Sequence, residues 1–494
     1  MMKLMSYKTK IFHPFLLAIF PIIFLYSDTI NEVHSHQMLI PIVLMLVISI
    51  VLVIMAKFIF KNWKKSALII SLILVLFILY SPVFANVSGA SIGDFEVGKH
   101  RFLIIIFAVP ILIAGYLLFK TRKKLDNITL ILNIVTISLI LISVANIGTY
   151  YVEGSIYEND NDIQIISGNL SYPDIYFIVY DAYSGEKVLK NYYNYDNHDF
   201  INNLREKGFF VHDESYSNYD STVPSLGATF NMDYFDSNTE IKRVYAMFTE
   251  SNAVKIINSM GYKIIDFQKH SLAVDLPIVD KKLCKKDNNR FTDTRLLDQL
   301  LKYTPLSVFI EINPPEQDRD TQICLFAELL NTQAMFEEPT FVFAHSLVTH
   351  PPYFYGPNGE ALDSPTNAYD EHYVNAIKFA NKNTIQIVDK LLDVENPPII
   401  VISADHGTFR VISDNLTYEE KIRQQHQILY AVYFPDQNYE LVKKTTTPIN
   451  IFRIIFNQFF NTEYELLEDR TFSDSIVDAN DLDETTDILI NSRL

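Results

Sequence analysis

The sequence predicts a protein of two parts: an N-terminal bundle of about five transmembrane helices, and after it an α/β domain with a mostly parallel sheet. Three observations predict this division. The chain has 494 residues, more than a single hydrophobic core usually spans. Long apolar stretches are confined to residues 1–149. Beyond them, short apolar runs alternate with amphipathic ones, a pattern typical of strands and helices wound around a parallel sheet.

The charge changes sign at the same boundary. Residues 1–149 hold 13 Lys and Arg against 5 Asp and Glu, whereas the rest of the chain holds 28 against 53. An acidic domain stays soluble, and it lacks the basic face that nucleic acid requires. We therefore expect no nucleic-acid partner for this membrane-embedded chain.

Five apolar stretches predict the membrane helices, and the cations between them predict the orientation. Lys and Arg cluster before the first stretch, after the second and after the fourth. Because cations beside a span stay on the cytoplasmic side, the N-terminus is predicted inside and the chain beyond Gly148 outside, at the plasma or inner membrane. A cleaved signal peptide is the alternative for the first stretch, but no small-residue cleavage site follows it. The stretches are 11–26, 38–56, 66–85, 102–119 and 128–145.

The exported part is predicted to consist of a connector at 150–171, a catalytic domain at 172–472 and an acidic tail at 473–494 that is solvated or disordered. Within the domain, the polar and proline-interrupted segment 268–325 is predicted to be an insertion that could cover a pocket. The predicted strands are 175–180, 263–267, 340–344 and 398–403. The predicted helices are 186–207, 251–260, 370–392 and 448–460.

Three of these strands are followed by side chains suited to chemistry. Asp181 follows the first strand, His345 and then His350 follow the third, and Asp405 with His406 follow the fourth. Ligands of such folds bind beyond the carboxyl ends of the strands, so these side chains are predicted to share one pocket. Each alone could be a turn former or a helix cap.

The most specific motif is Ser403-Ala404-Asp405-His406-Gly407. A carboxylate oxygen beside an imidazole nitrogen suits zinc or manganese, and a glycine allows the tight turn behind them. The motif therefore predicts a metal site at this strand end.

A second motif, residues 217–226, contains Ser221-Thr222-Val223-Pro224. Pro224 suits the first turn of a helix, which places a hydroxyl near backbone N–H groups that favour an anion. The hydroxyl could attack a phosphorus or sulfur centre. From this motif alone, a simple capping role for Ser221 or Thr222 is the better interpretation.

The two cysteines, Cys284 and Cys324, both lie in the exported part. Export permits a disulfide, and two buried free thiols are the alternative. Nothing in their spacing decides between them.

In order and spacing these motifs resemble the sulfatase branch of the alkaline phosphatase superfamily. The resemblance rests on residues 173–181, 222–225, the His345/His350 pair and 403–407. It is strongest to membrane-anchored members such as lipoteichoic acid synthases and phosphoethanolamine transferases, which also carry about five N-terminal helices. The resemblance therefore implies an α/β sulfatase-like catalytic domain.

Carried over residue by residue, the resemblance implies one divalent ion, zinc or manganese, with calcium as the alternative. Asp181, Thr222, Asp405 and His406 match the metal ligands, and Thr222 also matches the nucleophile. His350 matches a histidine that holds the substrate phosphate or a second ion. His345 resembles its substrate-binding companion, and a buried histidine at a strand end is the equal alternative.

Two departures refine the expected reaction. Sulfatases proper need Cys or Ser at the nucleophile position and Arg four residues later, where this chain has Thr222 and Leu226. Asp181 is followed by Ala182 rather than a second aspartate. The resemblance therefore implies transfer of a phosphate-bearing group to a membrane lipid or cell-surface glycan. Hydrolysis of phosphate or sulfate esters is one alternative, and a binding domain without catalysis is the other.

Overall fold

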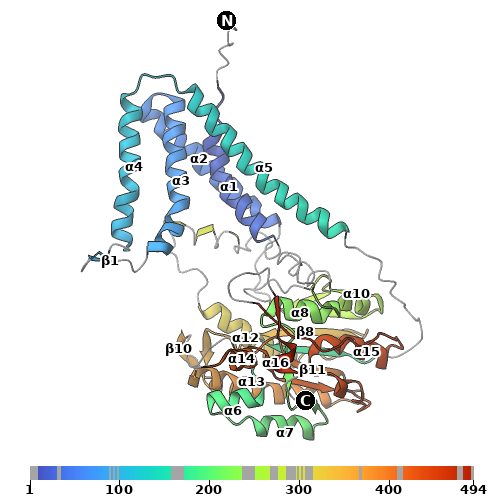
Figure 1. Cartoon of the computed structure of the whole chain (residues 1–494). Helices are drawn as coiled ribbons and strands as arrows, with labels where there is room; N and C mark the ends of the chain where they lie inside the picture. The colour runs from blue at the N-terminus through green and yellow to red at the C-terminus, as the bar shows by residue number, and fades with distance from the viewer. Residues whose placement is uncertain are drawn as a thin grey trace. The chain divides into compact units, whose positions relative to one another are not determined.

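The computed structural model describes residues 9–30, 35–87, 91–92, 95–96, 99–156, 172–235, 251–267, 276–284, 296, 300–301, 304–305, 315–366, 370–408, 416–474 and 482–490. The chain forms two compact units (Figure 1). The membrane unit comprises residues 1–159 and 287–314. The α/β unit comprises residues 160–286 and 315–494.

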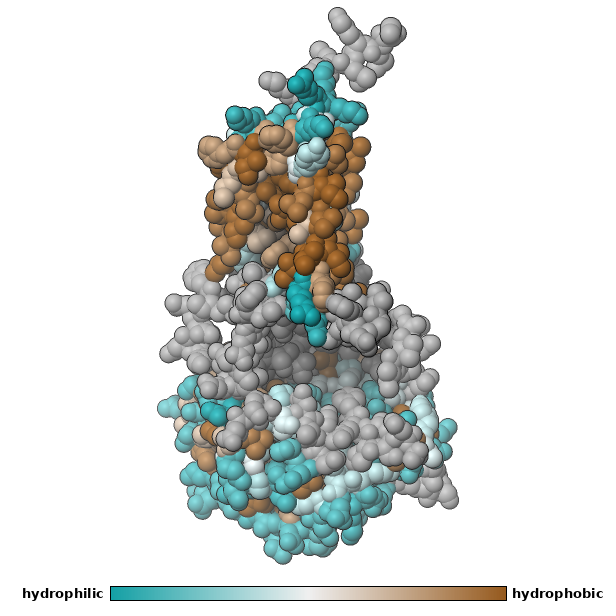
Figure 2. Space-filling model, turned by 90° about the vertical axis from the view of Figure 1, so that its left-hand side faces the viewer, coloured by the Kyte–Doolittle hydropathy of each residue, from teal (hydrophilic) through white to brown (hydrophobic). Residues whose placement is uncertain are grey.

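Among the described residues, four helices of the membrane unit are long and apolar enough to cross a membrane. On the face shown in Figure 2, most of the surface of the membrane helices is brown, the colour of hydrophobic residues. The first predicted span corresponds to α1 (His13–Asp28), whose 16 residues extend about 24 Å and which packs against α2, α3 and α5. The four long helices are α2 (Leu39–Phe60), α3 (Trp63–Val87), α4 (His100–Lys120) and α5 (Asp126–Ile156). Short elements between them are η1 (Ser35–Met38), β1 (Ser91–Ile92) and β2 (Phe95–Glu96).

Hydrogen bonds join the helix ends that carry the predicted cytoplasmic cations. Lys65 Nζ donates to the carbonyl of Thr121 at 2.7 Å, and Asn133 Nδ2 donates to the carbonyl of Lys10 at 2.8 Å. The three cation clusters therefore lie at one end of the membrane unit, as the orientation rule requires.

A seven-stranded sheet forms the centre of the α/β unit, with the order β4-β13-β11-β3-β8-β6-β7. The five strands from β11 to β7 are parallel, while β13 is antiparallel to both of its neighbours. This arrangement confirms the predicted α/β fold with a mostly parallel sheet. The strands are β3 (Ile175–Tyr180), β4 (Phe210–Val211), β6 (Lys263–Phe267), β7 (Lys281–Leu283), β8 (Thr340–Ser346), β11 (Ile399–Ala404) and β13 (Tyr430–Tyr433).

Helices cover both faces of this sheet, because both faces of its buried strands are apolar. On β3, Phe177 and Val179 face one layer, whereas Ile178 and Tyr180 face the other. The first layer contains α8 (Thr222–Asn231), α10 (Asn252–Ser259) and α15 (Ile451–Phe459). The second contains α6 (Glu186–Tyr193), α7 (His198–Glu206), α12 (Pro315–Leu329) and α13 (Asp370–Leu392). The other elements are β5 (Ser215–Tyr216), β9 (Tyr353–Tyr355), β10 (Ala361–Thr366), α14 (Tyr418–His426), β12 (Gln427–Ile428), η3 (Val442–Lys444) and η4 (Pro448–Asn450).

The predicted helix 186–207 is two helices rather than one. Asn194 adopts a left-handed conformation with φ of 51°, which ends α6, and α7 begins at His198. Asparagine tolerates this conformation better than most residues, so the break is local.

The predicted insertion 268–325 is smaller than expected. β7 joins the sheet beside β6, and α12 begins at Pro315. Only 287–314 group with the membrane unit, where Leu296 and Leu300 pack in one apolar cluster with Leu25 of α1. The sequence also predicted that this insertion could cover the pocket, but most of its residues lie outside the part of the chain that the structure describes.

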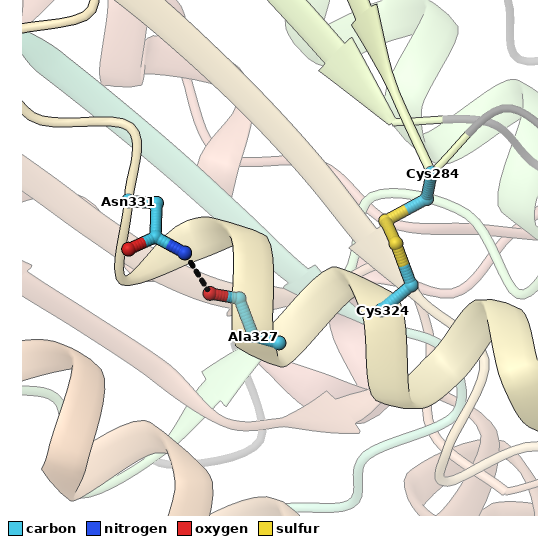
Figure 3. The surroundings of a disulfide bond; sticks show 4 residues. All are labelled: Cys284, Cys324, Ala327 and Asn331. Atoms are coloured by element: carbon cyan, nitrogen blue, oxygen red, sulfur yellow. Dashed lines mark hydrogen bonds between the residues drawn. A yellow bond between two sulfur atoms is a disulfide. The ribbon is translucent and has the colours of Figure 1, made fainter.

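Cys284 and Cys324 form a disulfide (Figure 3). It links the end of β7 to α12, so it joins the two ends of the segment that leaves the α/β unit. Of the two alternatives that the sequence left open, the structure has the disulfide. A disulfide is typical of a domain outside the cytoplasm.

The acidic tail is not fully solvated, in contrast to the prediction. β14 (Phe472–Asp474) pairs with β15 (Leu482–Glu484), and α16 (Thr486–Leu489) follows. Leu489 is fully buried against Tyr216 and Ile422, and this apolar contact offsets the charge of the segment.

Candidate metal centre

The side-chain alternation of three strands gathers the polar side chains of the site on one face of the sheet. Along β3, β8 and β11, odd-numbered residues face the layer that contains α8. Asp181, His345 and Asp405 continue this alternation at or just beyond the strand ends. The parallel register aligns those ends, because Tyr180 lies opposite both Ser346 and Ala404.

Two carboxylates form the centre of the site. Oδ1 of Asp405 accepts hydrogen bonds from the backbone N–H groups of Ala182 at 3.1 Å and His406 at 2.9 Å. Its Oδ2 lies 3.5 Å from Nε2 of His345 and 3.7 Å from Nε2 of His406. Asp181 contacts the same two nitrogens, with Oδ2 3.5 Å from His345 and Oδ1 3.6 Å from His406.

Thr222 completes the cluster from the first turn of α8. Its hydroxyl donates to Oδ2 of Asp181 at 3.4 Å and lies 3.3 Å from Nε2 of His406. Ser221 is the N-cap residue of α8, and its side chain makes no capping hydrogen bond. Neither hydroxyl therefore serves as the cap that the motif alone favoured.

The donor atoms fit a divalent cation. Oδ1 of Asp181 and Oδ2 of Asp405 are buried without a hydrogen-bond partner among the described residues, which is costly for carboxylates in the absence of a counter-charge. Nδ1 of His406 lies 2.7 Å from the carbonyl of Gly407, so an N–H there leaves Nε2 with the lone pair that a metal needs. Asp181, His345 and Asp405 each offer one ligand atom within 4.8 Å of the others. Oxygen with nitrogen in this mixture suits zinc or manganese.

Gly407 fixes the turn behind the two motif ligands. A Cβ atom at this position would lie 2.1 Å from the backbone oxygen of Gln424. Any other residue would push the turn away from the last turn of α14, where Gln424 and Gln425 lie, which explains the glycine of the motif.

The charges of the site reinforce one another. Burial alone would raise the pKa of the Asp405 carboxyl, but the neighbouring His406 and His345 lower it well below its usual range. Burial would likewise lower the pKa of His345, yet the carboxylates of Asp181 and Asp405 outweigh it and raise that pKa. The same two carboxylates raise the pKa of His406 against burial. The site thus favours cations between its carboxylates.

His350 stands apart from the other predicted site residues. It is half-buried in the turn after β8, where its backbone N–H donates to the carbonyl of Leu347. No hydrogen bond or ion pair between described residues joins its side chain to the cluster. The structure therefore gathers five of the six predicted residues and leaves His350 outside that contact network.

The sequence pattern did not single out two buried side chains close to the cluster. Burial lowers the pKa of His426 at the end of α14, against the opposing charge of Asp220, and the charge of His406 lowers it further. Nδ1 of His426 lies 3.0 Å from the carbonyl of Ser217, and Asp220 accepts a hydrogen bond from Ser473 at 2.5 Å. No sequence motif links His426 to Asp405. Its position beside the cluster follows from the pairing of β12, which begins at the next residue, with β5.

Comparison with known proteins identifies the family. The family model described as sulfatase matches residues 173–461, and no curated protein matches the chain. Similar solved structures include the C-terminal periplasmic domain of EcEptC from Escherichia coli, at 13% identity over 67% of this chain and 97% of that one, with a TM-score of 0.44. The integral membrane lipooligosaccharide phosphoethanolamine transferase A from Neisseria meningitidis has 13% identity over 90% of this chain and 95% of that one, with a TM-score of 0.40. The periplasmic domain of phosphoethanolamine transferase EptC from Campylobacter jejuni has 15% identity over 61% of this chain and 94% of that one, with a TM-score of 0.39. The family match covers more than half of the chain, including every strand end of the site, and the chain therefore belongs to the sulfatase family of enzymes.

Proposed function

We propose that this enzyme transfers a phosphate-bearing group through Thr222, at the outer surface of the membrane, to a membrane lipid or cell-surface glycan. The observation that carries the proposal is the position of the Thr222 hydroxyl. It lies within 3.4 Å of both Asp181 and His406, and it does not cap the helix in which it stands. A hydroxyl held among metal-ligating groups is the arrangement that nucleophilic catalysis needs.

Asp181, Thr222, Asp405 and His406 would hold the divalent ion. When bound, such an ion lowers the pKa of a ligating hydroxyl and polarises a phosphoryl oxygen. The residues themselves contribute position: Asp405 is fixed by two backbone N–H groups, and His406 by the carbonyl of Gly407. Groups held in this way fix the position of the Thr222 hydroxyl, as nucleophilic attack requires.

The transfer takes two steps. Oγ1 of Thr222 forms a bond to the phosphorus of the donor, the bond from that phosphorus to the donor alcohol breaks, and the alcohol leaves with the proton that Thr222 gives up. An acceptor hydroxyl then attacks the phosphorus, the bond from that phosphorus to Oγ1 of Thr222 breaks, and the proton of the acceptor hydroxyl returns to Oγ1. The first turn of α8 presents backbone N–H groups to the phosphate oxygens, which carry the negative charge.

The membrane unit favours a substrate in the membrane. A soluble ester would not require four helices of spanning length on the same chain. The threonine nucleophile also argues against sulfate hydrolysis by an oxidised cysteine or serine, because threonine cannot form that aldehyde.

Intact-mass analysis tests the proposal. The detergent-solubilised full chain is incubated with zinc or manganese and with vesicles of bacterial membrane lipid, then measured without acceptor. A mass increase equal to a phosphate-bearing headgroup is expected on the wild type and not on Thr222→Ala. An unchanged mass, together with release of the free phosphate-bearing headgroup, would indicate hydrolysis through water. An unchanged mass with no product would indicate a binding domain.

A further inference from the structure

We infer that His345 is a direct ligand of the ion held by Asp181 and Asp405, so that the centre contains two imidazoles. The inference rests on the proposed metal centre and goes beyond it. The resemblance implied four ligands and gave His345 a place beside the substrate. Four independent features of the site assign His345 to the ion instead.

The first feature is its place in the sheet. His345 lies on β8, opposite Val179 of the neighbouring β3, one residue pair before the strand ends. The alternation of β8 directs it to the same face as Asp181 and Asp405, the face covered by α8. An imidazole one pair back from the edge is long enough to reach the level of the two carboxylates.

The second feature is the set of distances. Nε2 of His345 lies 3.5 Å from Oδ2 of Asp181 and 3.5 Å from Oδ2 of Asp405. Ligand atoms at 2.0–2.2 Å from one four- or five-coordinate ion lie about 2.8–3.8 Å from one another. The four other close distances between cluster residues, which involve Thr222 and His406, range from 3.3 to 3.7 Å. His345 thus fits the same coordination sphere as the four proposed ligands.

The third feature is the lack of a hydrogen bond. A protonated imidazole between two carboxylates would donate at about 2.7–2.9 Å. His345 approaches neither so closely, and neither of its nitrogens has a hydrogen-bond partner among the described residues, although the side chain is only 1% exposed. A buried imidazole whose Nε2 faces two carboxylate oxygens at 3.5 Å without a hydrogen bond is explained by a cation between them.

The fourth feature is charge. A nitrogen that faces two carboxylates at equal distance is poorly placed to receive a phosphate, because both carboxylates repel it. His350, half-buried in the following turn, remains available for the substrate. The electrostatics of the site therefore assign His345 to the ion rather than to the phosphate.

Two imidazole ligands select the ion. Calcium and magnesium prefer oxygen ligands, whereas imidazole suits zinc and related transition metals. A centre with His345 and His406 should therefore bind zinc more tightly than manganese or calcium. The second imidazole therefore restricts the metals that the site can bind more than His406 alone would.

X-ray absorption at the zinc edge tests the inference, because imidazole rings scatter strongly and can be counted. The full chain is loaded with one equivalent of zinc in detergent. Two imidazoles per zinc are expected in the wild type and in the control His350→Ala, and one in His345→Ala. Zinc affinity should fall at least tenfold in His345→Ala and stay unchanged in His350→Ala.

One imidazole in the wild type, or a count that His345→Ala leaves unchanged, would overturn the inference. If His345→Ala does not fold, the count in the wild type decides alone, and His345→Gln tests whether a neutral polar side chain keeps the fold. The imidazole count tests the ligand, whereas the covalent adduct on Thr222 tests the proposed transfer, so the two can fail independently. Two imidazoles without a covalent adduct on Thr222 would refute only the transfer, and an adduct with one imidazole would refute only the ligand.

Discussion

At the scale of single residues, Thr222 offers a variant in which chemistry and stability separate. Because Thr222 makes no capping bond, Thr222→Ala should lower the free energy of unfolding by only about 1 kcal/mol, from the lost buried methyl and a weak hydrogen bond. Turnover should vanish. Thr222→Ser should retain part of it, since the hydroxyl remains but is held less firmly.

Release of a chromogenic alcohol from a phosphodiester, with a sulfate ester in parallel, measures these variants. Ser221→Ala is the matched control, because its side chain makes no capping bond and it should keep most of the activity. Loss of activity in Ser221→Ala with full activity in Thr222→Ala would mean that the motif is aligned one residue out.

The ion pairs of the site predict opposite responses to pH with and without metal. The carboxylates raise the pKa of His345 and His406 above the ordinary value, despite burial. A raised pKa stabilises the fold below the unfolded value and loses that contribution as pH rises through the folded value. With a chelator, the melting temperature should therefore fall as the pH rises above about 6.5, the ordinary pKa of histidine.

With zinc the trend should reverse, because the ion binds neutral imidazoles and its stabilisation grows as protons leave. Thermal unfolding of the solubilised chain, with and without chelator, measures both slopes. His350→Ala should show the same pair of slopes as the wild type. Parallel slopes under the two conditions would show that no ion binds between these groups.

Sequence alone predicted these residues unevenly. Asp181, Asp405 and His406 could be found because each follows a continuous apolar run, which marks both the strand and its end. His345 was found as well, but its partners follow from the side-chain alternation of β8. His426 could not be found, since no local pattern ties residue 426 to a strand end 20 residues earlier. Its position depends on tertiary packing.

At the scale of elements, buried strands and long amphipathic helices were predicted best. α13 spans the residues that its periodicity predicted, because 23 residues of one pattern leave little ambiguity. The sequence analysis did not predict the short elements correctly. The split between α6 and α7 depends on one left-handed residue, and β7 has only three residues on a sheet edge. Such elements are defined by their neighbours rather than by their own sequence.

The disulfide between β7 and α12 predicts a measurable loss of stability. Cys284→Ser should destabilise the α/β unit by about 2–4 kcal/mol, because the bond closes a loop with a sequence separation of 40 and restricts the unfolded chain. Cys324→Ser and the double variant should lose the same amount, since either change breaks the bond. Chemical unfolding followed by circular dichroism measures this. Costs that add in the double variant would show that the cysteines stabilise the fold by packing instead.

At the scale of the whole molecule, charge and hydropathy change after residue 149, where the sequence predicted a boundary, and the two units divide between residues 159 and 160. The sequence did not predict that 287–314 would leave the α/β unit and group with the membrane helices. That assignment depends on apolar contacts between Leu296, Leu300 and the end of α1, which are far apart in sequence. Local composition carries no information about such contacts.

The orientation of the chain follows from the cations and makes the last prediction. Lys10, Lys65 and the 120–124 cluster meet at one end of the membrane unit, so an N-terminus inside places all three inside. Five crossings, with α1 as the shortest, then place the α/β unit outside, where its disulfide is stable. Protease added to intact spheroplasts should therefore digest the α/β unit. An epitope placed at Arg122 should stay protected until the membrane is opened, which controls for leakage. Protection of the α/β unit would mean that α1, at about 24 Å, does not cross, and that four crossings leave the site in the cytoplasm.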